Sequence, residues 1–149
     1  MPPRRQRGPC FLGCPLGPWY DRRYAADIHC GVSPEAPGAA ELDQALESLE
    51  AITALTREGR EPFASSADRR LALGFLWVNV GSALKQFCRV RGIAQGSSPF
   101  PGPIGLRDRL CYQRPADLSA RILWSTCADD TGPLVALLAD LRRALPDEP

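Results

Sequence analysis

The spacing of apolar side chains changes at Ala39, where an irregular sequence gives way to a helical pattern that continues to Leu145. The first periodic segment has apolar residues at i, i+3, i+4 and i+7, the pattern of an amphipathic helix with one buried face. Its apolar positions are Leu42, Ala45, Leu46, Leu49 and Ile52. Gly59 and Pro62 follow these positions, and we expect them to end the helix.

The second periodic segment predicts a long helix from Ser65 or Ser66 to about Gly92. Either serine suits the cap position, because a side-chain oxygen there accepts a hydrogen bond from a free backbone N–H of the first turn. The charged residues from Asp68 to Arg70 are expected to lie in solvent. The expected buried stripe consists of Leu71, Phe75, Val78, Ser82 and Phe87.

The stretch GIAQGSSPFPGP ends the second helix, and two further helical regions follow it. A short helix is expected from about Ile104 to Tyr112, and Pro115 prevents its extension. The last region begins near Asp117 and is expected to restart at DDTGP, where Pro133 suits a first helical turn. Its apolar positions are Leu118, Ile122, Leu123, Trp124, Leu134, Leu137, Leu138, Leu141 and Leu145.

These patterns predict an all-α protein with two parts. Residues 39–149 are expected to form a bundle of four to five helices, because strand-like alternation and internal repeats are absent from the sequence. Residues 1–38 are rich in proline, glycine and arginine and are expected to form an irregular N-terminal extension. Arginines interleaved with Trp19, Tyr20 and Tyr24 could hold a phosphate backbone and stack bases. The interpretation we favour is that these aromatics pack on the bundle while the arginines stay in water.

Composition places the chain among soluble globular proteins. Of its 149 residues 44% are hydrophobic and 23% charged, and the formal net charge is +1. A net charge this small provides no global field for a nucleic acid or a membrane surface, so any basic surface must be local. No stretch of about twenty apolar residues was found that would span a membrane. We therefore expect a cytoplasmic protein without membrane contact.

The six cysteines allow a structural and a metal-binding interpretation. Cys88, Cys111 and Cys127 lie in apolar helical patterns and are expected to be buried as small hydrophobic residues. In the extension, Cys10, Cys14, His29 and Cys30 are four groups of the kind that bind zinc. Their spacing is not C-x-x-C, and the adjacent histidine and cysteine cannot easily face one tetrahedral centre. The sequence therefore predicts no metal and no cofactor.

The segment PIGLRDRLCYQRPADLSARILW, residues 103–124, concentrates the candidate chemistry. Arg107, Asp108 and Arg109 lie among apolar residues, and Tyr112 stands where a helix is about to end. Taken by residue type alone, Arg107 and Asp108 form a local ion pair on a helix surface.

The order of segments resembles that of HEPN proteins, and it is most similar to the HepT-like toxins encoded beside minimal nucleotidyltransferases. The resemblance covers about Ala39 to Leu145: an acidic first helix, a long second helix with NVGSALKQF, a proline-rich break, GLRDRL, a polar turn, ADLSARILW and a terminal helix started by proline. The family motif is an arginine, a polar residue, three further positions, a histidine, one further residue and a tyrosine.

The motif matches this chain only in part. Arg107 falls on the motif arginine and Asp108 on the polar residue, whereas Tyr112 stands in place of the histidine and Arg114 in place of the tyrosine. The resemblance implies a metal-independent ribonuclease, in which the histidine moves protons and the arginine stabilises the charged transition state. A tyrosine with the ordinary pKa near 10 is about one part in a thousand ionised at pH 7, so it is a poor base.

Two functions follow as expectations. The first is a non-catalytic or attenuated relative of the toxins, which dimerises through the face carrying Arg107 and binds RNA or a nucleotide with Arg107, Arg109 and Arg114. The second is an active ribonuclease toxin of a toxin–antitoxin pair, with Arg107, Asp108 and Tyr112 in the cleft. The resemblance also implies a nucleotidyltransferase antitoxin that adds AMP to the motif tyrosine, a position that Arg114 occupies here.

Overall fold

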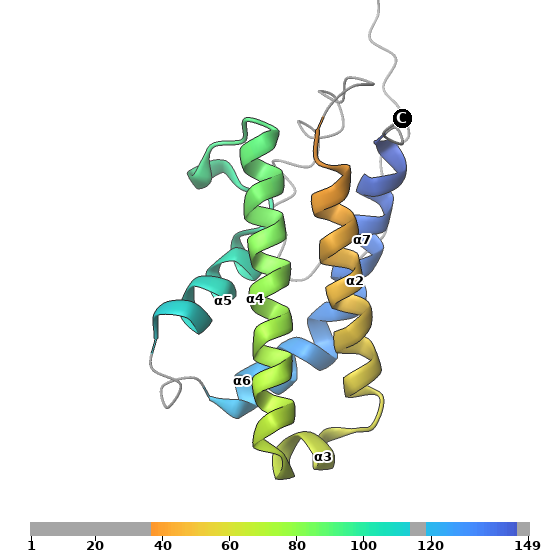
Figure 1. The fold of residues 1–149 in the computed structure, drawn as a ribbon, viewed down its shortest axis with the longest axis vertical. Helices are drawn as coiled ribbons and strands as arrows, with labels where there is room; N and C mark the ends of the chain where they lie inside the picture. Colours follow the sequence, from red (N-terminus) through yellow and green to blue (C-terminus); the bar gives the residue numbers. More distant parts are fainter. Residues whose placement is uncertain (1–36, 114–118, 146–149) are drawn as a thin grey trace, which may run out of the picture.

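The computed structural model describes residues 37–113 and 119–145, and within them every regular element is helical (Figure 1). The prediction of an all-α fold is confirmed for this part of the chain. The elements are α2 (Ala39–Thr56), α3 (Arg60–Ser65), α4 (Ala67–Val90), η1 (Gln95–Ser97), α5 (Pro101–Tyr112), α6 (Ala120–Ser125), η3 (Thr126–Asp130) and α7 (Thr131–Ala144).

Helix α4 is the central element of the bundle. It packs most extensively against α2 and α5, while α2 also packs against α7. Figure 1 shows α4 in front, with α5 to one side of it and α2 and α7 to the other. The largest side chains without solvent exposure include Trp77 and Phe87 of α4, Leu42 and Leu49 of α2, and Leu138 of α7. The core therefore lies between α4, α2 and α7.

Helix α2 begins where the backbone passes close to α4. Gly38 precedes it with a φ of 129°, a conformation that residues with a side chain rarely adopt. A Cβ atom on Gly38 would lie 2.8 Å from the ring of Phe87. The glycine therefore allows α2 to start directly against the far end of α4.

The predicted end of the first helix is confirmed, but α3 was not predicted. Pro62 lies in the first turn of α3, where a backbone N–H has no partner within the helix, so proline is tolerated there. Phe63 of α3 is buried, and its ring centroid lies 5.2 Å from that of Trp124. Arg70 donates from Nη1 to the carbonyl oxygens of Phe63 and Ala64 at 3.2 and 2.7 Å. Arg70, which was predicted to lie in solvent, therefore caps the C-terminal end of α3.

Helix α4 starts as predicted, but of the predicted buried stripe only Phe87 is fully buried. The Oγ of Ser66 accepts from the backbone N–H of Arg69 at 3.3 Å, which confirms the serine cap. Leu71 and Phe75, expected in the buried stripe, are 68% and 65% exposed. The buried apolar residues of α4 are Leu73, Trp77, Val80, Ala83, Leu84, Phe87 and Cys88.

Helix α5 starts earlier than predicted and approaches α4 closely. Pro101 and Pro103 lie in its first turn, so they begin the helix instead of delaying it. A Cβ atom on Gly81 of α4 would lie 2.3 Å from the Cβ of Arg107 and 2.7 Å from the carbonyl oxygen of Pro103. The absence of a side chain at Gly81 therefore sets the distance between the two helices.

The last region remains helical where a restart was predicted. A π-helical turn, η3, joins α6 directly to α7. Pro133 lacks an N–H, and its ring would clash with the carbonyl of Asp129 in a regular α-helix, so a wider turn before it relieves the contact. The Oγ1 of Thr131 donates to the carbonyl oxygen of Cys127 at 2.8 Å within this turn.

Candidate functional site

The strongest candidate site lies where α5 packs on α4, around Arg107. Its side chain is 21% exposed, and its Nε donates to the Oγ of Ser82 on α4 at 3.2 Å. Its Nη1 donates to the Oδ1 of Asp108 at 2.8 Å. Lys85 of α4 places its Nζ 3.8 Å from the same oxygen. We call Ser82, Lys85, Arg107 and Asp108 the Arg107 cluster.

The electrostatics of this cluster favour a permanent positive charge on Arg107. The hydrogen bond to the Asp108 carboxylate is the main cause that raises the pKa of Arg107, and Tyr112 contributes in the same direction. The guanidinium carbon of Arg107 lies 5.7 Å from the centre of the Tyr112 ring, within cation–π range. Arg107 is therefore held from three sides, by Ser82, Asp108 and Tyr112.

The chemistry available to this cluster is anion binding. A guanidinium has five N–H donors, and the contacts with Ser82 and Asp108 engage only Nε and Nη1. Lys85 adds a second cation on the neighbouring helix. No histidine lies within residues 37–113 or 119–145, because the single histidine of the chain is His29. The described part of the site therefore has groups that attract phosphate but no imidazole to move a proton.

The structure brings some of the predicted site residues together. Asp108 and Tyr112 both contact Arg107. Arg109 is exposed on α5, and Arg114 lies outside the described residues. The cysteines and histidine weighed as zinc ligands also lie outside them, and no group of three or more His, Cys, Asp or Glu residues that could hold a metal occurs among those described.

Sequence reasoning missed the contribution of α4 to this site. Ser82 was assigned to the buried stripe, and Lys85 was not considered. The available signal was a serine and the only lysine of the chain, which lie three positions apart on one side of the predicted helix. Pairing that side with α5 required the tertiary structure.

Cysteine burial was predicted correctly at two of three positions. Cys88 and Cys127 are buried, whereas Cys111 is exposed, so the expectation that it points into the core was wrong. The position of α5 that lies against α4 is occupied by Arg107, whose Cβ lies close to Gly81. The Sγ of Cys127 accepts from the Nε1 of Trp77 at 3.2 Å.

Burial of Cys127 leads to a prediction about alkaline stability. Desolvation raises the pKa of its thiol from 9.0 to about 11, against the smaller opposing effect of the hydrogen bond from Trp77. Between these values the folded protein keeps a proton that the unfolded chain loses, so the free energy of unfolding should fall as the pH rises. The expected loss across this window is about 2–3 kcal/mol.

Urea unfolding measured at several pH values from 8 to 11 checks this expectation. Cys127→Ala removes the ionisable group and should flatten most of the slope. Burial also raises the pKa of Cys88, so a smaller slope of the same sign should persist in the variant. Equal slopes in the two proteins would contradict the assignment to Cys127.

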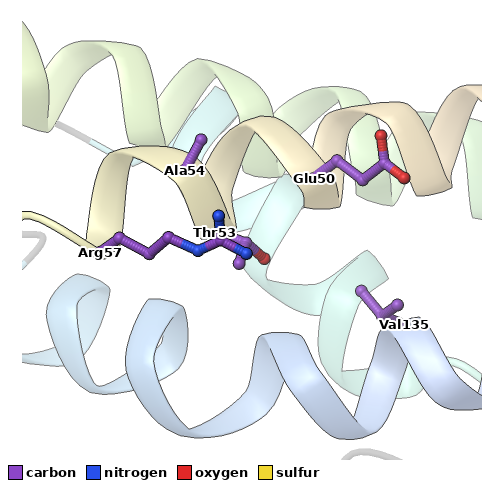
Figure 2. A pocket seen from close by; sticks show the side chains of 5 residues that line it. All are labelled: Glu50, Thr53, Ala54, Arg57 and Val135. Atoms are coloured by element: carbon purple, nitrogen blue, oxygen red, sulfur yellow. The ribbon is translucent and has the colours of Figure 1, made fainter.

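A second surface feature lies on the opposite side of the bundle. A shallow depression of about 360 Å³ between α2 and α7 is lined by Glu50, Thr53, Ala54, Arg57 and Val135 (Figure 2). The Thr53 hydroxyl is already engaged, because it donates to the carbonyl oxygen of Leu49 at 2.9 Å. The depression shares no residue with the Arg107 cluster.

Helix α4 also meets the length and composition criteria of a membrane span, which the sequence analysis did not anticipate. Half of the qualifying window is buried inside the bundle. A core helix of a soluble protein passes the same test, so this property of α4 assigns no location.

No protein-family model, curated protein or solved structure matches this chain. The function must therefore be argued from the residues and their geometry.

Proposed function

We propose that this chain is a HEPN-fold, HepT-like protein that binds RNA or a nucleotide at the Arg107 cluster without cleaving it, and that it acts as a homodimer. The observation that supports the binding role is the placement of Arg107, which Ser82 and Asp108 hold at 3.2 and 2.8 Å while part of its side chain stays exposed. The helical bundle is compatible with this family, and the order of its segments is what suggested the resemblance.

Phosphate recognition by this cluster follows from its charges. An arginine offers a planar set of donors that matches the oxygens of a phosphate, and its charge does not depend on pH in the neutral range. Lys85 can contact a neighbouring phosphate as a point charge. Asp108 opposes anion binding, so the ligand has to compete with this carboxylate for Arg107. We therefore expect binding to be weak and to depend on salt.

The absence of cleavage follows from proton transfer. Attack of a ribose 2′-hydroxyl on phosphate needs a group that removes a proton and a group that returns one, and losing this help costs about 10²–10⁴-fold in rate. Tyr112 stands at the position of the motif histidine. Its exposed ring beside Arg107 is instead suited to stack on an unpaired base.

The proposed partners are a second copy of the chain, RNA, and a nucleotidyltransferase antitoxin. In HepT-like proteins the motif tyrosine is the position at which that antitoxin adds AMP. Arg114 occupies this position here, and an arginine offers no hydroxyl to accept the group. AMP transfer at this position is therefore not part of the proposal.

RNA binding tests the role of Arg107. Arg107→Ala should raise the Kd for a single-stranded RNA oligonucleotide about tenfold and make it less dependent on salt, because one phosphate contact is lost. Arg143→Ala is a matched control, since it removes one positive charge from an exposed position on α7. Fluorescence anisotropy at two salt concentrations measures both effects. Equal changes in the two variants would contradict a specific role for Arg107.

A cleavage assay on the same RNA tests the absence of catalysis. The wild-type protein should cut no faster than background. Cleavage by the wild type that is lost in both Arg107→Ala and Tyr112→Phe would instead identify an active ribonuclease in which the tyrosine has taken over the chemistry. The non-catalytic assignment would then be wrong.

A further inference from the structure

One face of α4 presents a repeat whose first positions are exposed, while Ser82 and Lys85 in its second half also contact α5. Its positions alternate in steps of three and four residues, which is the spacing of a coiled-coil seam. The seam consists of Asp68, Leu71, Phe75, Val78, Ser82, Lys85 and Arg89. It is acidic at the start of α4, apolar in the middle and basic toward the end.

The apolar middle of this seam is open to solvent. Leu71 and Phe75 are 68% and 65% exposed, and Val78 is half-buried. The other large exposed apolar residues of the described chain are Tyr112 and Ile122, on the neighbouring helices α5 and α6. An apolar face of this kind on a soluble domain marks an interaction surface.

The order of charges along the seam indicates which partner fits. Consider an antiparallel pair of α4 helices whose two-fold axis passes midway between Phe75 and Val78. A residue before this midpoint in one copy then faces the residue of the second copy that lies equally far after it. Phe75 then faces Val78 of the second copy, Leu71 faces its Ser82, and Asp68 faces its Lys85. The apolar Phe75 and Val78 meet at the centre, Leu71 meets the small Ser82, and opposite charges meet at both ends.

A parallel pair would bring like charges together. Asp68 would face Asp68 of the second copy, and Lys85 would face Lys85, which destabilises a helix pair. The seam is thus self-complementary in the antiparallel orientation only.

We infer that α4 is the dimer interface of this protein, formed by antiparallel pairing of the seam with a second copy of the chain. The inference rests on the proposed homodimer and specifies its surface. Because Ser82 accepts from Arg107 at 3.2 Å, Leu71 of the second copy lies beside the Arg107 cluster. Ser82 lies about 8 Å along α4 from the axis, at 1.5 Å per residue, so each Arg107 cluster lies toward one end of the interface and contributes Ser82 and Lys85 to it.

The first test measures association of the full chain by sedimentation equilibrium. The wild type should be a dimer at micromolar concentration, and Phe75→Glu should raise its dissociation constant about a hundredfold or more, because each substitution acts twice in a symmetric interface. Arg57→Glu, an exposed reversal at the end of α2, is the control and should leave association unchanged. Circular dichroism checks that each variant keeps its helices.

The second test is a charge exchange. Asp68→Lys and Lys85→Asp should each weaken the dimer about tenfold, and the double variant should recover to within about threefold of the wild type. Lys85→Asp also removes the contact between Lys85 and Asp108 within one chain. Loss of that contact cannot restore the dimer in the double variant, so the recovery reports on the pairing of Asp68 with Lys85 of the second copy.

The outcomes separate this inference from the proposed function. A monomeric wild type would overturn both the homodimer and the α4 pairing. A dimer that is unaffected by Phe75→Glu, or two charge reversals whose effects simply add, would overturn the pairing and leave a homodimer through another surface.

Discussion

Gly81→Val should destabilise the protein by about 3 kcal/mol or more and should displace α5 from α4. Already the Cβ atom of an alanine would lie 2.3 Å from the Cβ of Arg107 and 2.7 Å from the carbonyl oxygen of Pro103. Side-chain rotation cannot relieve these contacts, because one involves a backbone atom and the other the first side-chain atom of Arg107. The two helices must therefore separate, and overpacking of this kind typically costs about 1–3 kcal/mol for a few added atoms.

The same substitution should also disturb the candidate site. Separation of α5 from α4 moves Arg107 away from Ser82, and it moves Asp108 away from Lys85. We therefore expect the loss of stability to be accompanied by weaker RNA binding in conditions where the variant is still folded. Urea unfolding and fluorescence anisotropy measure the two effects on one preparation.

Gly105→Ala provides the matched control for Gly81. Gly105 lies in α5, and a Cβ atom there would have no neighbour within 4 Å. Alanine should stabilise the helix by about 0.5–1 kcal/mol, because glycine has more conformational freedom in the unfolded chain. A loss of stability at Gly105 comparable to that at Gly81 would show that close packing is not the reason for the effect.

Trp77→Ala should cost about 3–5 kcal/mol, the range for removing a large aromatic side chain from a packed core. The Trp77 side chain has no solvent exposure and lies on the central helix. The variant would be left with a cavity among α4 and its neighbours, and the Sγ of Cys127 would lose its donor. Thermal unfolding followed by circular dichroism should show a large fall in Tm.

Trp77→Phe separates the two contributions. Phenylalanine keeps most of the apolar volume but cannot donate to Cys127, so we expect a loss of only about 1–2 kcal/mol. A loss as large as that of the alanine variant would mean that the hydrogen bond, and not the packed volume, dominates at this position.

Local signals accounted for the two longest helices. The apolar spacing predicted the helices that became α2 and α4, and Ser66 acts as the predicted cap because its oxygen reaches the Arg69 N–H within one turn. These features depend on residues a few positions apart. Where prolines cluster, the same reasoning failed: Pro62, Pro101 and Pro103 each lie in a first helical turn, and a proline in that position begins a helix instead of breaking it.

The buried face of α4 could not be predicted from periodicity. Both the predicted stripe, with Leu71 and Phe75, and the observed one, with Leu73 and Trp77, have helical spacing. The choice between them depends on which faces of α4 the helices α2 and α5 approach, and the missing side chain of Gly81 allows the close approach of α5. The exposed residues of the predicted stripe, Leu71 and Phe75, belong to the seam that we propose as the dimer interface.

The sequence by itself determined the helical class of this protein and placed Arg107, Asp108 and Tyr112 within one short helix, because both properties follow from neighbours along the chain. The tertiary structure decided that Ser82 and Lys85 of α4 complete the cluster around Arg107. It also decided that Cys111 faces solvent and that Leu71 and Phe75 remain uncovered. These properties depend on the packing of α5 against α4, and residues more than twenty positions apart leave no periodic signal of such a contact.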